Sequence, residues 1–224
     1  MDLNIVGYGR SPVARDAFLA KQCVNVPSDE PRGGAAAAAA GWGRDAFCAR
    51  ISFHAGGYDA EESYAALDEK LSAYERAHAS GRPGNRLFFL SVPPTVFGAV
   101  AEMISRAARA ARGGFTRLMI EKPFGRDSAS FDALDALTAR HFDEAQLFRL
   151  DHYLGKEIVL NIPTLRWANA MFEPLWSRAH VESVQITFKE NLGTEGRGGY
   201  FDGFGIVRDI IQNHLLQVQN VMQM

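Results

Sequence analysis

The densest group of chemically active side chains follows the apolar run that ends at Leu150. Within six residues the chain carries a carboxylate, an imidazole, a phenol and an ammonium, on Asp151, His152, Tyr153 and Lys156. His152 and Lys156 are four residues apart where a helix is expected to begin, and positive charge beside free helix N–H groups favours a phosphate. A polar loop that connects two domains is the alternative.

A second histidine, His214, is a candidate general base on an expected helix. Imidazole has an ordinary pKa of about 6.5, so it can accept a proton near neutral pH. A carboxylate partner such as Asp151 would fix its tautomer and stabilise its cation. A histidine within a helix can also be purely structural, and the pattern alone leaves both interpretations open.

Further candidates follow apolar runs expected to be strands, because open α/β sheets bind ligands beyond the carboxyl ends of their strands. Only five of the 24 basic residues are lysines, and one of them, Lys122, precedes Pro123 at such an end. An X-Pro bond adopts the cis form at modest cost. The pair is therefore a candidate for a rigid turn that directs the lysine toward an anion, with an ordinary capped loop as the alternative.

Arg10 follows the apolar run Leu3–Val6 and the pair of glycines Gly7 and Gly9. The glycine pattern of dinucleotide sites is incomplete here, since Pro12 replaces the third glycine. An arginine after a second strand can nevertheless pair with the 2′-phosphate that distinguishes NADP from NAD. A solvated surface arginine is the alternative.

Composition argues against several classes of protein. A formal net charge of −2 does not suit a nucleic-acid binder, and no apolar stretch is long enough to span a membrane. Cys23 and Cys48 are the only cysteines, without zinc-ligand spacing, so neither a disulfide framework nor a metal site is expected. Hydrolase, metalloprotease and phosphate-loop motifs are also absent from the sequence.

The elements that must position these residues alternate along the chain. Expected strands are Leu3–Val6, Arg50–Phe53, Arg86–Leu90, Thr116–Ile120 and Gln146–Leu150; expected helices begin at the Ser11-Pro12 cap and span Glu61–His78, Thr95–Arg112 and Asp127–His141. Strands separated by helices of this length predict an α/β fold with a mostly parallel, Rossmann-like sheet. Residues 27–43, which include Ala35–Ala40, are expected to form a low-complexity surface loop, with an alanine helix as the alternative.

The alternation changes after Asp151. The pattern there predicts a helix, a strand over Val181–Phe188, a glycine-rich loop over Thr194–Tyr200 and an amphipathic helix from about Gly205. We therefore expect a coenzyme domain over residues 1–150 and the beginning of a second, α+β domain over residues 151–224.

Four motifs in this order resemble the glucose-6-phosphate dehydrogenase family. They are Glu121–Asp127, Arg149–Glu157, Gly193–Asp202 and Arg208–Gln217, and the resemblance extends from about Ile5 to Gln217. Residues 173–178 are most similar to the plastid forms of plants and algae. The resemblance implies oxidation of glucose 6-phosphate at C1 to the lactone with hydride transfer to NADP, the first step of the pentose phosphate pathway.

The resemblance also implies roles for individual residues. The substrate residues would be Lys122, His152, Tyr153, Lys156, Glu190 and Asp209; the base would be His214 with Asp151 as its partner; the coenzyme residues would be Arg10, Ser91, Pro93, Lys122 and Pro123. His152 and Lys156 would hold the 6-phosphate. The full-length parent is expected to be a homo-oligomer in the cytoplasm or the plastid stroma, with no nucleic-acid or membrane partner.

The sequence departs from the family in three ways. No Gly-x-x-Gly turn precedes Leu3, most of the second domain is missing, and Pro163 is expected to kink the helix after Lys156. We therefore expect a fragment of a dehydrogenase that does not turn over by itself. A non-catalytic module that binds a phosphosugar or serves assembly is the alternative function.

Overall fold

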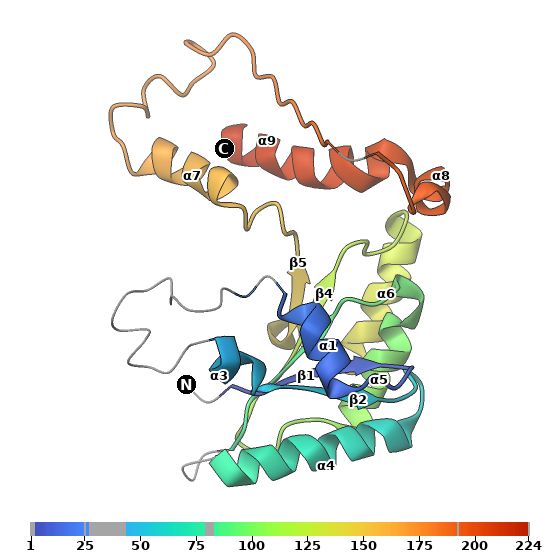
Figure 1. Ribbon diagram of the computed structural model, residues 1–224. Helices are drawn as coiled ribbons and strands as arrows, with labels where there is room; N and C mark the ends of the chain where they lie inside the picture. The colour runs from blue at the N-terminus through green and yellow to red at the C-terminus, as the bar shows by residue number, and fades with distance from the viewer. Residues whose placement is uncertain (1–2, 25, 27–43, 79–82, 192, 224) are drawn as a thin grey trace. The chain divides into compact units, whose positions relative to one another are not determined.

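The computed structural model describes residues 3–24, 26, 44–78, 83–191 and 193–223 (Figure 1). Its strands are β1 (Ile5–Gly9), β2 (Ile51–Ala55), β3 (Arg86–Leu90), β4 (Thr116–Glu121) and β5 (Leu147–Leu150). Its α-helices are α1 (Arg15–Gln22), α3 (Arg44–Cys48), α4 (Glu61–His78), α5 (Phe97–Ala107), α6 (Ser128–Ala139), α7 (Glu157–Trp167), α8 (Gly198–Ile206) and α9 (Leu216–Gln223). Short 3₁₀ turns cover Pro94–Val96 and Glu144–Gln146, and Val207–Leu215 is a π-helix. The predicted loop over residues 27–43 lies outside the described residues.

The chain forms two compact units. The first comprises Met1–Leu118 and Ala136–Leu147, and the second comprises Met119–Asp135 and Phe148–Met224. Both units are therefore built from segments that are discontinuous in the sequence. The expected division into two domains near residue 151 stays a prediction.

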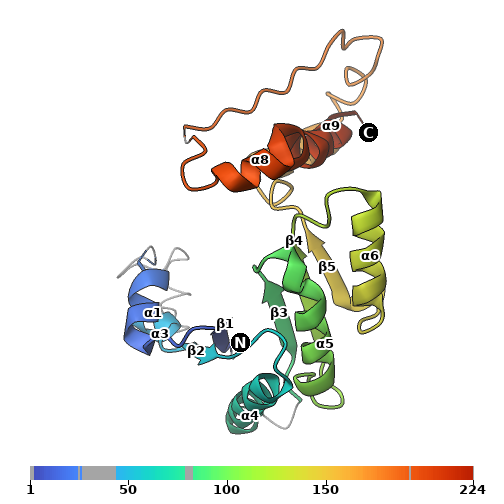
Figure 2. The same ribbon diagram turned by 90° about the vertical axis from the view of Figure 1, so that its right-hand side faces the viewer.

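The strands form two sheets, with the orders β1-β2 and β3-β4-β5. β1 pairs with β2 in parallel, so that Ile5 lies opposite Ile51 and Gly9 opposite Ala55. Figure 2 shows β3, β4 and β5 side by side in one sheet. The predicted α/β class with parallel pairing is confirmed.

An apolar stripe on α5 forms much of the core of the first unit. Phe97, Val100 and Ile104 recur at the spacing of one helix face, and all three are buried. Leu90 at the end of β3 and Leu118 in β4 are buried as well. The apolar run of β3, the alternation along β4 and the periodicity of α5 explain why these three elements were predictable.

Helix α4 is hydrogen-bonded to the β1-β2 pair and to the start of β3. Its Lys70 donates a hydrogen bond from Nζ to the carbonyl oxygen of Phe53 in β2, at 3.0 Å. Its Tyr74 donates from the hydroxyl to the carbonyl oxygen of Leu3, just before β1, at 3.3 Å. These bonds fix the helix against the β1-β2 pair.

The first residue of β3, Arg86, is a buried arginine that binds α4. Arg86 donates from Nε to Oε1 of Glu75 at 2.7 Å, and its guanidinium also binds Asp68 and Ser72. Burial alone would lower the pKa of Arg86, but the hydrogen bonds and charges of the two carboxylates raise it above its usual value. The start of β3 is thus held to α4 by a charged side chain that stays protonated.

Several predicted boundaries are wrong. Helix α1 begins at Arg15 rather than at the Ser11-Pro12 cap, because β1 continues to Gly9 and the following residues are needed for the turn. The predicted helix Thr95–Arg112 begins as a 3₁₀ turn and ends at Ala107.

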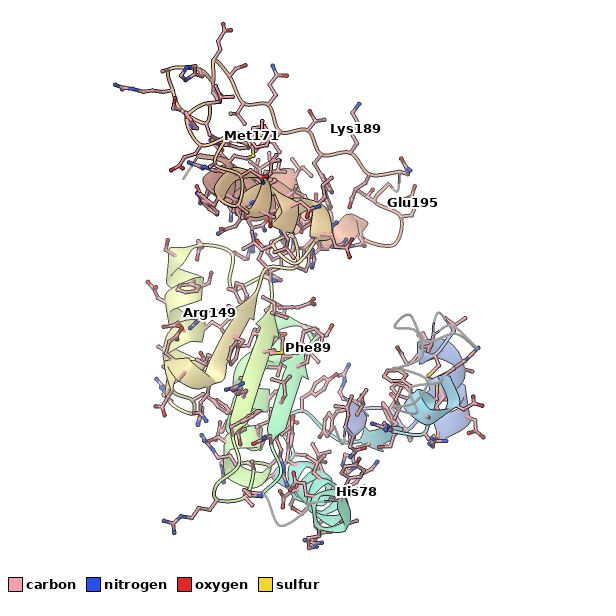
Figure 3. The ribbon with its side chains drawn as sticks, turned by 90° about the vertical axis from the view of Figure 1, so that its left-hand side faces the viewer. His78, Phe89, Arg149, Met171, Lys189 and Glu195 are labelled. Carbon is pink, nitrogen blue, oxygen red and sulfur yellow. The ribbon has the colours of Figure 1, made fainter. Side chains whose placement is uncertain are left out.

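The predicted strand Val181–Phe188 is also wrong. These residues have no regular secondary structure, because the described residues offer them no neighbouring strand and a strand is stabilised by its partners. Lys189, which follows them, points away from the helices of the second unit (Figure 3).

The glycine-rich segment is partly helical. α8 begins at Gly198, inside the predicted loop Thr194–Tyr200. Gly205 has φ of +67°, a value that favours glycine, and it forms a kink within α8, one residue before the end of that helix. The predicted helix after Gly205 is confirmed. α7 includes Pro163 and stays helical to Trp167.

Candidate active site

The second unit contains all the residues predicted to bind substrate or to act on it. They are Lys122, Asp151, His152, Tyr153, Lys156, Glu190, Asp209 and His214. Three predicted coenzyme residues, Arg10, Ser91 and Pro93, belong to the first unit, whereas Lys122 and Pro123 belong to the second.

A π-helix places two of the site residues on one face. Backbone hydrogen bonds in a π-helix join residues five apart, so residues at that spacing lie one above the other. Asp209 and His214 are five apart within Val207–Leu215, and both are buried. In an ordinary α-helix the same spacing would turn the two side chains about 140° apart. The unusual helix therefore brings a carboxylate and an imidazole to the same side.

His214 and Asp151 form a hydrogen-bonded pair. Nδ1 of His214 lies 2.9 Å from Oδ1 of Asp151, and the two side chains are 1% and 21% exposed. Because a carboxylate only accepts, Nδ1 carries the hydrogen of this bond and the lone pair is left on Nε2. The two side chains are thus paired, and this geometry is suitable for a base and a group that orients it.

Two rings stack on the His214 imidazole. The Tyr153 ring lies 4.0 Å from it between centroids and the His152 ring 4.9 Å. Burial lowers the pKa of His214, Asp151 opposes this, and the charges of Lys122 and His152 lower it further. The net pKa lies below the ordinary value, so the imidazole is neutral at neutral pH and available to accept a proton.

Lys122 and Asp209 form a second pair in the same unit. Nζ of Lys122 donates to the backbone oxygen of Asp209 at 2.7 Å and to its Oδ1 at 3.1 Å. Burial would raise the pKa of the Asp209 carboxyl, but Lys122 and other donors lower it below its usual value. The Lys122-Pro123 bond is cis, the form that the sequence analysis allowed without deciding. The Asp209 carboxyl is thus charged at neutral pH.

Tyr200 is a site residue that the sequence interpretation missed. Its hydroxyl donates to Oδ1 of Asp209 at 3.0 Å, so it shares that oxygen with Lys122. Burial and the bond to Asp209 raise the pKa of the Tyr200 phenol. Its position in the glycine-rich motif was the only available signal, because nothing in the spacing places residue 200 beside residue 209.

The cationic end of the site is more exposed. Lys156 is exposed, and its Nζ lies 4.2 Å from the centre of the Tyr153 ring, a cation–π distance. His152 is exposed too, and its ring lies beside Tyr153 with centroids 5.4 Å apart. Burial raises the pKa of the Tyr153 phenol, and the charge of exposed Glu190 raises it further. Two nitrogen donors therefore face solvent near the start of α7.

The coenzyme candidates of the first unit are exposed. The Arg10 guanidinium, just after β1, lies 5.7 Å from the centre of the Tyr58 ring. Ser91 and Pro93 follow the end of β3. Gly7 is closely packed against Phe18, since a Cβ there would lie 2.5 Å from Cζ of its ring. Its lack of a side chain is therefore explained without a ligand.

The described part of the chain has no group of three or more metal-ligating side chains that could hold an ion. Among the same residues, no helix combines the length and apolar character that a membrane crossing requires.

Comparisons with known proteins identify the family of the chain. The family model for the NAD binding domain of glucose-6-phosphate dehydrogenase matches residues 1–161, and the model for its C-terminal domain matches residues 163–224. A glucose-6-phosphate 1-dehydrogenase from Dictyostelium discoideum is 43% identical over 98% of this chain and 42% of its own length. The chloroplastic isoform 3 of Arabidopsis thaliana is 51% identical over 77% of this chain and 28% of its own. A cytoplasmic isoform of Arabidopsis thaliana is similar as well.

Solved structures are similar over almost the whole chain. One, described as glucose-6-phosphate dehydrogenase in complex with its substrate glucose-6-phosphate, has a TM-score of 0.84 and 38% identity, covering 99% of this chain and 44% of its own. The enzyme from Mycobacterium avium has a TM-score of 0.74 and 30% identity over 99% of this chain and 45% of its own. The chain thus spans less than half the length of these relatives. Its sequence and its fold place it in the glucose-6-phosphate dehydrogenase family, with a nicotinamide-dinucleotide-binding domain.

Proposed function

We propose that the enzyme to which this chain corresponds oxidises glucose 6-phosphate at C1 to 6-phosphoglucono-1,5-lactone. The observation that carries the proposal is the hydrogen bond between buried His214 and Asp151, in a unit that also holds the Lys122–Asp209 pair. A module that only binds a phosphosugar has no need of a neutral, oriented imidazole beside a carboxylate. Catalysis therefore accounts for this pair better than the non-catalytic alternative does.

The residues have distinct tasks in this reaction. Nε2 of His214 accepts the proton of the C1 hydroxyl as C1 gives up its hydride, and the Asp151 carboxylate stabilises the imidazolium that forms. The exposed ammonium of Lys156 and the imidazole of His152 bind the 6-phosphate, helped by the N-terminus of α7. Tyr200 and Lys122 hold Asp209 charged and in place. Asp209, Lys122, Tyr153 and Glu190 bind the sugar.

The coenzyme, when bound, supplies the hydride acceptor, and we propose that it is NADP. The Arg10 guanidinium fits a 2′-phosphate. Arg10 is exposed just after β1, and the described residues give it no carboxylate partner. A guanidinium binds phosphate with two parallel hydrogen bonds. Ser91, Pro93, Lys122 and Pro123 are the remaining proposed coenzyme residues.

Catalytic tests need a complete enzyme. We define the chimera as the Dictyostelium discoideum relative in which this chain replaces the matching 42% of its length. Glucose 6-phosphate dependent reduction of NADP by the chimera supports the proposed function, and a folded chimera without that activity contradicts it.

Arg10→Ala in the chimera should raise KM for NADP by roughly tenfold to a hundredfold, the loss of one charge-assisted contact. KM for NAD should change little, because NAD has no 2′-phosphate. Steady-state kinetics with both coenzymes measure the difference. Arg76→Ala, at an exposed arginine of α4, is the matched control. An equal effect on both coenzymes would assign Arg10 a structural role.

The pH dependence follows from the lowered pKa of His214. The base works when neutral, so kcat/KM should be constant above its pKa and fall as pH drops through a midpoint below about 6.5. Asp151→Asn removes the group that raises this pKa, so the acid limb should move to still lower pH while kcat also falls. pH–rate profiles of the two proteins test this, and a shift of the limb to higher pH would contradict it.

A further inference from the structure

The helix Val207–Leu215, between α8 and α9, keeps the π form over nine residues (Figure 1). π-Helices occur mostly as single turns inserted into α-helices, and they are frequent at functional sites. Here the pattern continues to the end of the segment, where the N–H of Leu216 bonds to the carbonyl of Ile211, five residues earlier. A form that the backbone rarely adopts over such a length indicates that other contacts in the second unit support it.

Both charged pairs of the candidate active site depend on this form of the helix. Asp209 binds Lys122, and His214 binds Asp151. Asp209 and His214 are five residues apart, so a π-helix places them on one face, whereas an α-helix would turn them about 140° apart. The same segment in the α form could therefore keep one of the two pairs but not both.

The side chain of Asn213 folds back onto this helix and bonds to its backbone at two points. Nδ2 of Asn213 donates to the carbonyl oxygen of Arg208 at 2.9 Å. Oδ1 of Asn213 accepts from the backbone N–H of His214 at 2.6 Å. A carbonyl needs a donor and an N–H needs an acceptor, so the two partners together require the donor and the acceptor of a side-chain amide.

The bond from Asn213 to Arg208 has the spacing of the π-helix itself. In a π-helix the carbonyl of Arg208 accepts from the backbone N–H of Asn213, five residues later, whereas in an α-helix it accepts from Gln212. The side-chain amide therefore adds a second bond between two residues that only the π form brings together. Asparagine is unfavourable inside α-helices because its amide competes for backbone groups, and here that competition favours the π form.

The bond from His214 to Asn213 holds the backbone that carries the imidazole. The π-helical acceptor of the His214 N–H is the carbonyl of Asp209, and that oxygen also accepts a hydrogen bond from Lys122 at 2.7 Å. Oδ1 of Asn213 supplies the same N–H with a further acceptor. The position of the imidazole on the helix is thus fixed by the side chain of the preceding residue.

We propose that Asn213 is a positioning residue whose amide holds Val207–Leu215 in the π form and so directs His214 to Asp151. Asp209 keeps its contact with Lys122 at the same time, because both side chains then lie on one face of the helix. Asn213 acts through His214 and does not itself bind the sugar. Its effect on catalysis rests on the proposed function, but its effect on the His214–Asp151 pair does not.

Two variants of the whole 224-residue chain test the two bonds. Asn213→Asp has the same size and keeps an acceptor for the N–H of His214, but it places an oxygen instead of a donor against the carbonyl of Arg208. Asn213→Leu has a similar size and offers neither group. The matched control is Asn220→Leu, at an exposed asparagine of α9.

NMR of nitrogen-labelled histidine side chains measures the pairing of His214 directly and needs no activity. At neutral pH the unaltered chain should show a fixed Nδ1–H tautomer for His214, because Nδ1 donates to Asp151. The signal is assigned by its absence from His214→Asn. Both Asn213 variants should lose it and show the averaged tautomers of an unpaired imidazole, and Asn220→Leu should keep it. A fixed Nδ1–H tautomer in either Asn213 variant would overturn the proposal.

The consequence for catalysis is measured in the chimera. Both Asn213 variants should lower kcat by at least about tenfold, because a catalytic group displaced by about 1 Å can cost about 10²-fold in rate. KM for glucose 6-phosphate should change little, because Asp209 keeps its bonds to Lys122 and Tyr200.

kcat is compared on the plateau of the pH–rate profile, because the added carboxylate of Asn213→Asp raises the pKa of His214 by its charge. Asn220→Leu should change neither constant. A normal kcat in an active chimera with either Asn213 variant, or a raised KM at normal kcat, would overturn the proposal. A folded chimera that is inactive without any substitution would contradict the proposed function instead, and the tautomer of His214 would still decide the role of Asn213.

Discussion

Replacement of His214 by Asn in the chimera should lower kcat by at least about 10²-fold, with KM for glucose 6-phosphate little changed. Asn keeps a hydrogen-bonding side chain of similar size beside Asp151 but has no nitrogen that accepts a proton, and loss of a general base has this scale of effect. Steady-state kinetics at saturating substrate measure the effect.

The matched control is His180→Asn, at an exposed histidine of the second unit that contacts Ser177. It should leave kcat unchanged. If His214→Asn kept a near-normal kcat, the base would have to be another residue, and the hydrogen bond between His214 and Asp151 would be structural.

Lys156→Ala should separate phosphate binding from general charge effects. Loss of one charge-assisted contact costs about 1.5–3 kcal/mol, so KM for glucose 6-phosphate should rise roughly tenfold to a hundredfold. KM for unphosphorylated glucose should change much less, because glucose offers no anion. The ratio of the two changes is the result that matters, and equal impairment of both sugars would remove the phosphate assignment.

The control for this variant must be a lysine without structural contacts. Lys70 does not qualify, because its ammonium donates to Phe53 and burial lowers its pKa. Lys21, exposed in the last turn of α1, is suitable, and Lys21→Ala should change neither KM.

Local patterns were sufficient to predict the regular part of the fold. The helix Glu61–His78 and the strand Arg86–Leu90 have the predicted bounds, because periodicity and flanking turn residues define both. The strand expected over Val181–Phe188 failed for a different reason. Its alternation is genuine, but strand formation depends on a partner, and the described residues supply none.

The candidate site was predictable in its members but not in its geometry. The cluster from Asp151 to Lys156 and the isolated His214 were evident from residue types alone. The π-helix that aligns Asp209 with His214 has no known signal in local spacing, and the contact of Tyr200 with Asp209 depends on that helix. Contacts that arise from an unusual backbone could be found only in the structure.

In the proposed reaction, residues of this chain remove a proton from glucose 6-phosphate and direct a hydride from its C1 to the coenzyme. Its most direct test supplies the chimera with glucose 6-phosphate deuterated at C1 and measures the mass of the reduced coenzyme. We expect the deuterium to be retained in the reduced coenzyme, and His214→Asn to slow its appearance by at least about 10²-fold. Deuterium released to water, or transfer at an unchanged rate in His214→Asn, would contradict it.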